Sequence, residues 1–364
     1  MPFSLQELGW DDARAAELAA LESLQSKTFL PGRVSRVDRG ALSVLTAVGA
    51  FRVRPSGRLF RFEPGVAASG DIEYSGEPIG TPAVGDWVAL DGPVAIAVLD
   101  RRSAFTRMSS DGQTVAQVVA ANVDTVFVVT PLIGRARPRL LQRCLALAWQ
   151  SGATPVVLLT KSDLSTDVDE RVAAAQADAV GVEVFAVSAA TGAGIDDLTP
   201  YVCAGKTVAM IGPSGAGKST LTNALGAGGV ALATGAVRDD GKGRHTTTAR
   251  ELVVLPCGAV AIDTPGLRGL ALWEADEGIN AAFADVAELA ADCRFADCAH
   301  HTEPGCAVAR AIAEGDLDAS RFDDYEKLLR EHARLIARRD GRARAQQRAR
   351  SKVFYKAIRD QPHR

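Results

Sequence analysis

The pattern of apolar and polar positions changes twice along the chain. Residues 11–24 are rich in Ala and Leu and predict a helix. From residue 32 to about residue 108, short runs alternate between apolar and polar residues, and Gly, Pro and Asp separate them. The clearest of these runs cover residues 32–37, 41–45, 49–53, 86–90 and 95–99. Five short strands in this length predict a small antiparallel barrel.

An OB-fold fits a barrel of this size, and OB-folds commonly bind nucleic acids. The segment that leaves the barrel, residues 101–107, carries three arginines and one aromatic residue. It could contact RNA or be an ordinary solvated strand. A barrel that acts only as a spacer also remains open, because a fold alone does not give a function.

From about residue 117, strand and helix patterns alternate. Apolar runs predict strands, and longer mixed runs between them predict helices. The strands are expected at residues 123–129, 155–159, 182–187 and 207–211, and the helices at 138–152 and 168–179. Residues 252–262 predict two further strands with a turn at Cys257-Gly258. This alternation predicts an open, mostly parallel sheet covered by helices.

A glycine-rich loop lies between the strand at 207–211 and a following helical run. It matches G-x-x-x-x-G-K-[ST], and its residues are Gly212, Pro213, Ser214, Gly215, Ala216, Gly217, Lys218, Ser219 and Thr220. Glycines let consecutive backbone N–H groups turn toward phosphate oxygens, and the helix N-terminus adds positive potential. Lys218 is then expected to reach the outer phosphates as a catalytic group, and Ser219 to bind Mg²⁺.

Two loops at the ends of other predicted strands resemble motifs that read a guanine base. Thr160, Lys161, Ser162 and Asp163 resemble N-K-x-D, in which the Asp accepts two N–H bonds from the base. Thr160 replaces the usual Asn, so we expect a weaker bridge between loops. Ser188 and Ala189 resemble the S-A-x motif. Each loop by itself could equally be a polar turn after a strand.

A third loop, Asp263-Thr264-Pro265-Gly266, resembles D-x-x-G. Its Asp263 would hold Mg²⁺ through water, and the N–H group of Gly266 would sense the third phosphate. The Gly- and Thr-rich run 241–248 before it predicts a mobile switch loop in which Thr247 binds Mg²⁺. The motifs occur in a circularly permuted order, with the two base-reading loops ahead of the phosphate loop.

The position that follows D-x-x-G is Leu267 instead of a glutamine that could orient water. We therefore expect the isolated protein to hydrolyse its bound nucleotide slowly. His245, in the switch run, is the candidate for the missing catalytic group, because a neutral imidazole can orient water. A loop histidine without a catalytic part is an equally good interpretation.

A separate cluster of cysteine and histidine residues follows residue 272. Cys293, Cys298, His300 and Cys306 form C-x4-C-x-H-x5-C, and four such ligands predict a closed, structural Zn²⁺ site. His301 could replace His300. Free cysteines in a helical segment are the alternative.

Composition and charge limit the class of protein. The chain has 364 residues, of which 47% are apolar and 23% charged, as in ordinary globular proteins. No apolar run is long enough to span a membrane and no secretory signal is apparent, so we expect a cytoplasmic protein without a membrane partner. Residues 330–364 carry ten Arg and two Lys against three acidic residues, although the whole chain carries −3. A basic tail on an acidic body predicts a polyanionic partner.

Taken together, the chain resembles the circularly permuted ribosome-biogenesis GTPases called RsgA or YjeQ. The resemblance rests on Gly85-Asp86-Trp87-Val88 in the barrel, on the permuted motifs, on G-R-H-T-T-T in the switch run, and on the cysteine cluster with Glu303-Pro304-Gly305-Cys306. It implies a multidomain chain: an N-terminal helix with an OB-fold barrel (residues 1–112), a circularly permuted α/β P-loop GTPase domain (113–276), and a mainly α zinc-binding domain with a basic C-terminal helix (277–364).

The resemblance also implies a function. A monomer would bind the small ribosomal subunit and its rRNA, and would hydrolyse GTP to GDP and phosphate late in subunit maturation, with one structural Zn²⁺ and with Mg²⁺ on GTP. The subunit would stimulate hydrolysis. Two other functions stay open: a GTPase of another RNA system, such as the large subunit or tRNA modification, and an RNA-binding adaptor that uses GTP only as a structural ligand.

Overall fold

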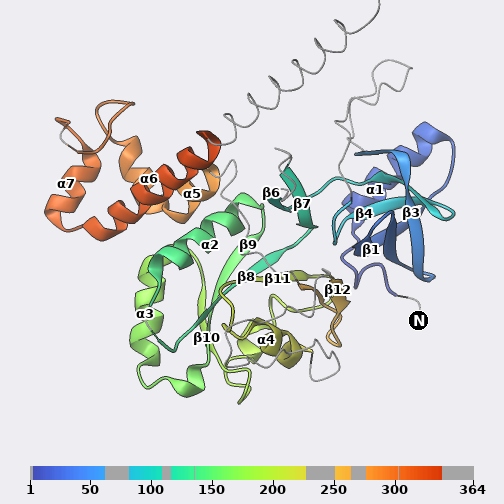
Figure 1. Ribbon diagram of the computed structural model, residues 1–364, viewed down its shortest axis with the longest axis horizontal. Helices are drawn as coiled ribbons and strands as arrows, with labels where there is room; N and C mark the ends of the chain where they lie inside the picture. The colour runs from blue at the N-terminus through green and yellow to red at the C-terminus, as the bar shows by residue number, and fades with distance from the viewer. Residues whose placement is uncertain are drawn as a thin grey trace, which may run out of the picture.

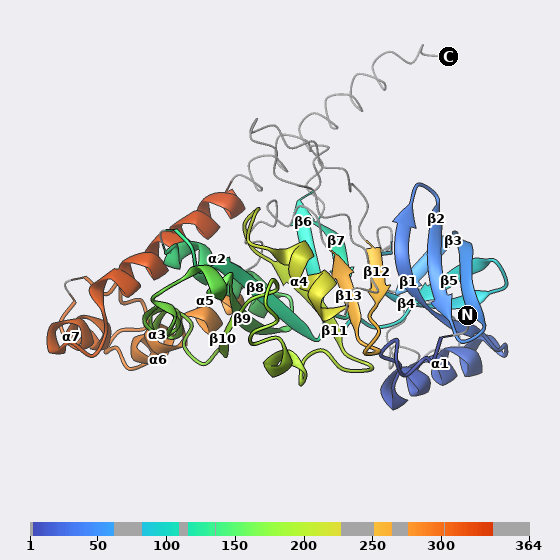
Figure 2. The same ribbon diagram turned by 90° about the horizontal axis from the view of Figure 1, so that it is seen from below.

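The computed structural model describes residues 3–61, 82–108, 116–134, 136–226, 251–263, 276–301 and 303–337. Three regions follow one another along the long axis of the molecule (Figures 1 and 2). A β-barrel lies at one end, a mostly parallel sheet in the middle and a group of helices at the other end. Among the described helices, none is long and apolar enough to cross a membrane.

The N-terminal region is a closed five-stranded barrel with one helix beside it. Its elements are α1 (Asp12–Gln25), β1 (Leu30–Asp38), β2 (Ala41–Thr46), β3 (Gly49–Arg61), β4 (Trp87–Asp91) and β5 (Val94–Val98). β1 pairs with both β2 and β4, β3 pairs with β2 and β5, and β4 pairs with β5, so the ring closes. This confirms the predicted OB-type barrel, but β3 and β5 pair in parallel, so the barrel is not antiparallel throughout as the sequence pattern predicted. Alternate residues of β2 are buried, as its sequence pattern predicts.

The central region is a six-stranded sheet in the order β10-β9-β8-β11-β13-β12. Its strands are β8 (Thr125–Pro131), β9 (Thr154–Thr160), β10 (Val184–Val187), β11 (Thr207–Ile211), β12 (Glu251–Val254) and β13 (Val260–Asp263). All pair in parallel except β12, which is antiparallel to β13. The helices of this region are α2 (Pro138–Gln150), α3 (Val168–Asp178) and α4 (Lys218–Leu225), and single 3-10 turns cover Ser162–Leu164 and Asp196–Leu198.

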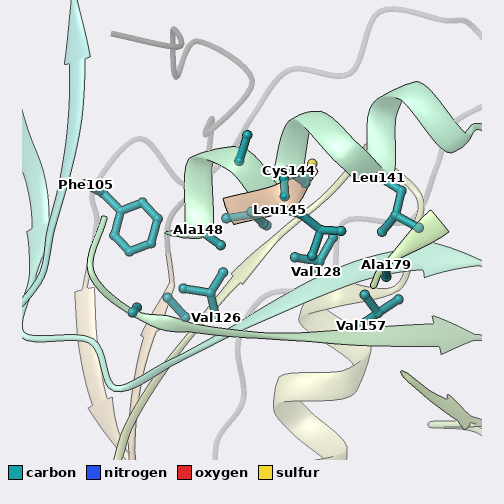
Figure 3. Packing of buried hydrophobic residues seen from close by; sticks show 14 of the residues in the cluster. Phe105, Val126, Val128, Leu141, Cys144, Leu145, Ala148, Val157 and Ala179 are labelled. Atoms are coloured by element: carbon teal, nitrogen blue, oxygen red, sulfur yellow. The ribbon is translucent and has the colours of Figure 1, made fainter. Parts of the chain in front are cut away.

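Strand β8 is apolar without alternation because both faces of the sheet are covered. Val126 and Val128 pack beneath α2 against Leu141 and Leu145 (Figure 3). The intervening Phe127 belongs to a second cluster on the other face. Cys144 also lies in the packed face of α2, and burial raises the pKa of its thiol to about 11. We conclude that Cys144 is a packing residue that stays protonated at neutral pH.

Two features of the sheets were not predicted. β12 also pairs with barrel strand β1, with Arg36 opposite Glu251, so barrel and central sheet form one continuous hydrogen-bonded sheet. β6 (Ala104–Met108) and β7 (Ala116–Ala121) form a separate hairpin between the two regions. The predicted boundary after residue 112 falls between these two strands.

The C-terminal region is helical. It contains α5 (Asp276–Ala282), α6 (Ala284–Ala291), α7 (Ala307–Glu314) and a helix over residues 319–337. Two ion pairs join the last helix to α2: Arg139 with Asp324 at 2.6 Å, and Arg143 with Glu331. The basic tail from residue 338 lies outside the described residues.

Candidate functional site

Four predicted loops follow strands of the central sheet at the same edge. Thr160 ends β9, Val187 ends β10, Ile211 ends β11 and Asp263 ends β13. These strands run in parallel, so their carboxyl ends share one edge of the sheet, which is where α/β proteins bind ligands. The permuted order of the motifs therefore does not prevent them from meeting.

The phosphate loop, residues 212–220, connects β11 to α4. Gly212 has φ +145°, and a Cβ there would lie 2.1 Å from the carbonyl oxygen of Val129, so only glycine fits. Gly217 has φ +91° directly before α4. Lys218 Nζ donates to the carbonyl oxygens of Gly212 (2.9 Å) and Pro213 (2.8 Å). The lysine thus lies across the loop, where a phosphate group would be within its reach.

The base loop, residues 160–163, is fixed to the phosphate loop. The hydroxyl of buried Thr160 donates to the carbonyl oxygen of Ala216 at 2.6 Å. The sequence predicted a weaker bridge with Thr in place of Asn, and the structure retains one direct bond. Lys161 has φ +62°, a left-handed conformation that non-glycine residues rarely adopt. This turn places Ser162 and Asp163 in the 3-10 turn, with Asp163 exposed.

Ser188 and Asp163 are in direct contact. The hydroxyl of fully buried Ser188 donates to the Asp163 carboxylate. The Ser188 hydroxyl in turn accepts the N–H of Thr191 at 3.2 Å, which fixes its orientation, and half-buried Ala189 follows. The structure therefore brings together the two loops that resemble base-reading motifs, and it orients the carboxylate.

Some predicted site residues cannot be placed. Asp263 is the last residue of β13, so its backbone lies at the same edge of the sheet as the other loops. The structure does not describe its side chain. His245, Thr247, Gly266 and Leu267 lie outside the described residues. Their assigned roles stay predictions.

A second candidate site lies in the C-terminal region. One donor atom from each of Cys293, Cys298, His300 and Cys306 lies within 4.8 Å of the others. Cys293 Sγ is 3.9 Å from Cys306 Sγ and 3.4 Å from His300 Nδ1. Tetrahedral zinc with Zn–S bonds of about 2.3 Å separates its sulfur ligands by about 3.8 Å. The cluster therefore fits zinc in donor type and in spacing.

Two further observations support this metal cluster. The N–H of Ala307 donates to Cys293 Sγ at 3.3 Å, and the N–H of Ala309 donates to Cys306 Sγ at 3.3 Å. Burial and the neighbouring cysteines raise the pKa of the Cys298 thiol to about 11. Burial also raises the pKa of the Cys293 thiol, but hydrogen bonds with the backbone N–H groups of Val308 and Ala307 and with Cys306 and Cys298 outweigh it, so its net pKa is lowered. A lowered pKa favours the thiolate that a metal needs.

The alternative ligand His301 is directed elsewhere. Its Nε2 is 3.3 Å from the Glu326 carboxylate, and its side chain is 59% exposed. His300 has φ +61°, and this conformation lets its ring join the cysteines. Sequence spacing could not separate the two histidines, because the difference depends on one backbone angle.

The comparisons with known proteins agree with this geometry. A sequence model of the RsgA GTPase family matches residues 98–273. The chain is 45% identical to the small ribosomal subunit biogenesis GTPase RsgA of Streptomyces coelicolor, over 94% of this chain and 90% of that protein. It is 44% identical to the protein of the same name from Opitutus terrae, over 98% of this chain and 97% of that one.

Solved structures show the same fold. The crystal structure of YjeQ from Thermotoga maritima is 26% identical, with a TM-score of 0.61 over 84% of this chain and 98% of that chain. YloQ, described as a circularly permuted GTPase, is 25% identical, with a TM-score of 0.58 over 84% of this chain and 96% of that one. Sequence, fold and motif order thus agree over nearly the whole length, and we conclude that this chain belongs to the RsgA family of circularly permuted GTPases and is a GTP-hydrolysing enzyme.

Proposed function

We propose that this GTPase binds the small ribosomal subunit and hydrolyses GTP to GDP and phosphate late in the maturation of that subunit. The observation that carries the proposal is the end-to-end similarity to relatives named small ribosomal subunit biogenesis GTPases, which covers 94% and 98% of this chain in two cases. The five-stranded barrel supports a nucleic-acid partner, since OB-folds commonly bind one. We further propose that the subunit stimulates hydrolysis.

In the proposed nucleotide site, different loops bind different parts of GTP. The phosphate loop binds the phosphates through its backbone N–H groups and Lys218, while Thr160, Lys161, Ser162, Asp163, Ser188 and Ala189 bind the base. Mg²⁺ on GTP, held by Ser219, Thr247 and Asp263, would stabilise negative charge on the phosphates. Lys218 adds a fixed positive charge, whose orientation over the loop is already set by two carbonyl oxygens.

The metal cluster is proposed to hold one structural Zn²⁺ through Cys293, Cys298, His300 and Cys306, because four protein ligands leave no open position for chemistry. We also propose that the basic tail contacts rRNA phosphates. In this proposal the protein acts as a monomer, with domains at 1–112, 113–276 and 277–364.

The test is single-turnover phosphate release from GTP by the isolated protein, with and without purified small subunits. Large subunits at equal concentration are the control. The proposal requires slow release alone and faster release with small subunits only. Equal rates in all three reactions would contradict stimulation by the small subunit, and stimulation by large subunits would favour another RNA system.

The same assay tests the proposed role of His245. His245→Ala should lose most of the stimulation but keep GTP affinity, because orientation of water by a histidine contributes to catalysis and not to binding. A stimulated rate equal to that of the wild type would leave the ribosome as the source of the catalytic group.

A further inference from the structure

A cavity of about 190 Å³ lies where α1, the barrel and the central sheet meet. Its walls come from the N-terminal turn (Gln6 to Asp11), from Arg14 of α1, from Arg33 of β1 and from residues 204–207, which lead into β11. Thr207 begins β11, and the other end of this five-residue strand leads directly into the phosphate loop. The cavity is therefore at the edge of the sheet opposite to the nucleotide site.

The cavity has more positive than negative charge. Arg14, Arg33, Arg102 and Lys206 line it, against Asp11 and Asp124. Asp11 is shared between Arg14, at 3.2 Å, and Arg102. Asp124 accepts the backbone N–H of Thr207 at 2.7 Å. Both carboxylates thus already have hydrogen-bond partners in the protein, and a net positive charge remains at the cavity.

Arg33 lacks a full counter-charge among its hydrogen-bond partners. Its side chain is 1% exposed, and its guanidinium donates to the backbone carbonyl oxygens of Leu8, Gly85 and Asn122. Burial, together with the nearby Arg14 cation, lowers the pKa of Arg33 to about 9. A buried cation in such surroundings is stabilised by an anion.

Two of the residues that line the cavity each carry a buried polar atom without a partner in the described part of the chain. These atoms are Nε of Arg14, whose residue is 6% exposed, and Oγ1 of Thr207, whose residue is 1% exposed. Buried polar atoms are nearly always hydrogen-bonded in folded proteins, and a buried polar atom without a protein partner commonly binds an ion or a water molecule. One atom is a charged donor and the other is a hydroxyl that can donate.

We propose that this cavity is a phosphate-binding site, in which Arg14 Nε and the Thr207 hydroxyl donate to the oxygens of one phosphate group. The volume is several times the roughly 30 Å³ that one water molecule occupies in the liquid, so a tetrahedral oxyanion fits. Gly9 and Gly205 allow the wall to pack closely: a Cβ on Gly9 would lie 2.9 Å from Arg33 Nη1, and one on Gly205 would lie 2.9 Å from the carbonyl oxygen of Gln6. The phosphate is either free or part of an RNA chain.

The test uses the full-length protein with a non-hydrolysable GTP analogue and Mg²⁺ at saturation, so that every phosphate position of the phosphate loop is already filled. Equilibrium dialysis with radiolabelled inorganic phosphate should find one additional site per chain. Thr207→Val has the same shape but no hydroxyl, and should weaken this binding about tenfold or more, as expected for a hydrogen bond to a charged group. Lys206→Gln removes one exposed charge at the rim and should weaken binding a few-fold.

Arg39→Gln is the charge-matched control, because Arg39 is exposed in the turn between β1 and β2, away from the cavity lining. It should bind phosphate like the wild type, and all three variants should bind GDP normally. Displacement of phosphate by a short single-stranded oligoribonucleotide would assign the site to RNA, and lack of displacement would assign it to a free oxyanion. No additional phosphate site in the wild type, or equal binding by Thr207→Val and Arg39→Gln, would overturn the proposal.

Discussion

At the scale of single residues, Thr160 is the most informative position of the nucleotide site. Its hydroxyl joins the base loop to the phosphate loop through the carbonyl oxygen of Ala216. The motif alone indicated a departure from Asn and a weaker bridge. It could not identify the acceptor, because Ala216 lies 56 residues further along the chain and contributes only a backbone atom.

Thr160→Val should weaken GDP binding about tenfold. The substitution keeps the shape of the side chain but leaves the Ala216 carbonyl without this donor, and an unsatisfied buried group costs about 1–3 kcal/mol. Thr160→Ser retains the hydroxyl and should bind GDP like the wild type. Titration with a fluorescent GDP analogue measures both variants, and equal affinities for Val and Ser would show that the bond does not hold the loops together.

At the scale of elements, regular runs were predictable and long-range partners were not. The uninterrupted apolar run at residues 126–129 predicts a buried strand, and the structure covers both of its faces. The hairpin of β6 and β7 was missed, because 116–121 is a short Ala- and Val-rich run without alternation. The burial of Arg33 was also missed, since an arginine in an alternating strand ordinarily predicts an exposed position.

The metal cluster yields a prediction about elements, because its ligands join α7 to the loop before it. Cys298→Ala should reduce zinc from about one ion per chain and destabilise the C-terminal helices. His301→Ala is the matched control, since its ring pairs with Glu326 and should not be needed for the metal. Metal analysis and thermal unfolding of both variants are the measurements. Full zinc occupancy in Cys298→Ala, or its loss in His301→Ala, would contradict the ligand set.

The contact between α5 and α2 yields a second prediction. A Cβ on Gly278 of α5 would lie 2.3 Å from the carbonyl oxygen of Ala146 in α2. Gly278→Ala should therefore lower the free energy of unfolding by about 1–3 kcal/mol through overpacking, despite the better helix propensity of Ala. Gly57→Ala is the control, because a Cβ there meets nothing within 4 Å. Denaturant unfolding should separate the two variants, and equal stability would mean that the helices move apart without strain.

At the scale of the whole molecule, circular permutation changes the order of the loops along the chain but not their place on the sheet. β8, β9 and β10 precede β11 in sequence, yet β8 lies next to β11 in the sheet. The barrel strand β1 pairs with β12, the strand that follows the predicted switch run and leads through β13 to Asp263. Barrel and nucleotide site are therefore connected through one hydrogen-bonded sheet.

The central claim is that the permuted loops form one guanine-specific site, and Asp163→Asn tests it most directly. Asn can still accept the Ser188 hydroxyl through its amide oxygen, while its amide nitrogen donates where the carboxylate accepted. The Asp163→Asn variant should then bind xanthosine triphosphate in preference to GTP, measured as the ratio of its affinities for these two nucleotides. Asp169→Asn, an exposed position in the first turn of α3, should keep the preference for GTP. An Asp163→Asn variant that still prefers GTP as strongly as the wild type would contradict the claim.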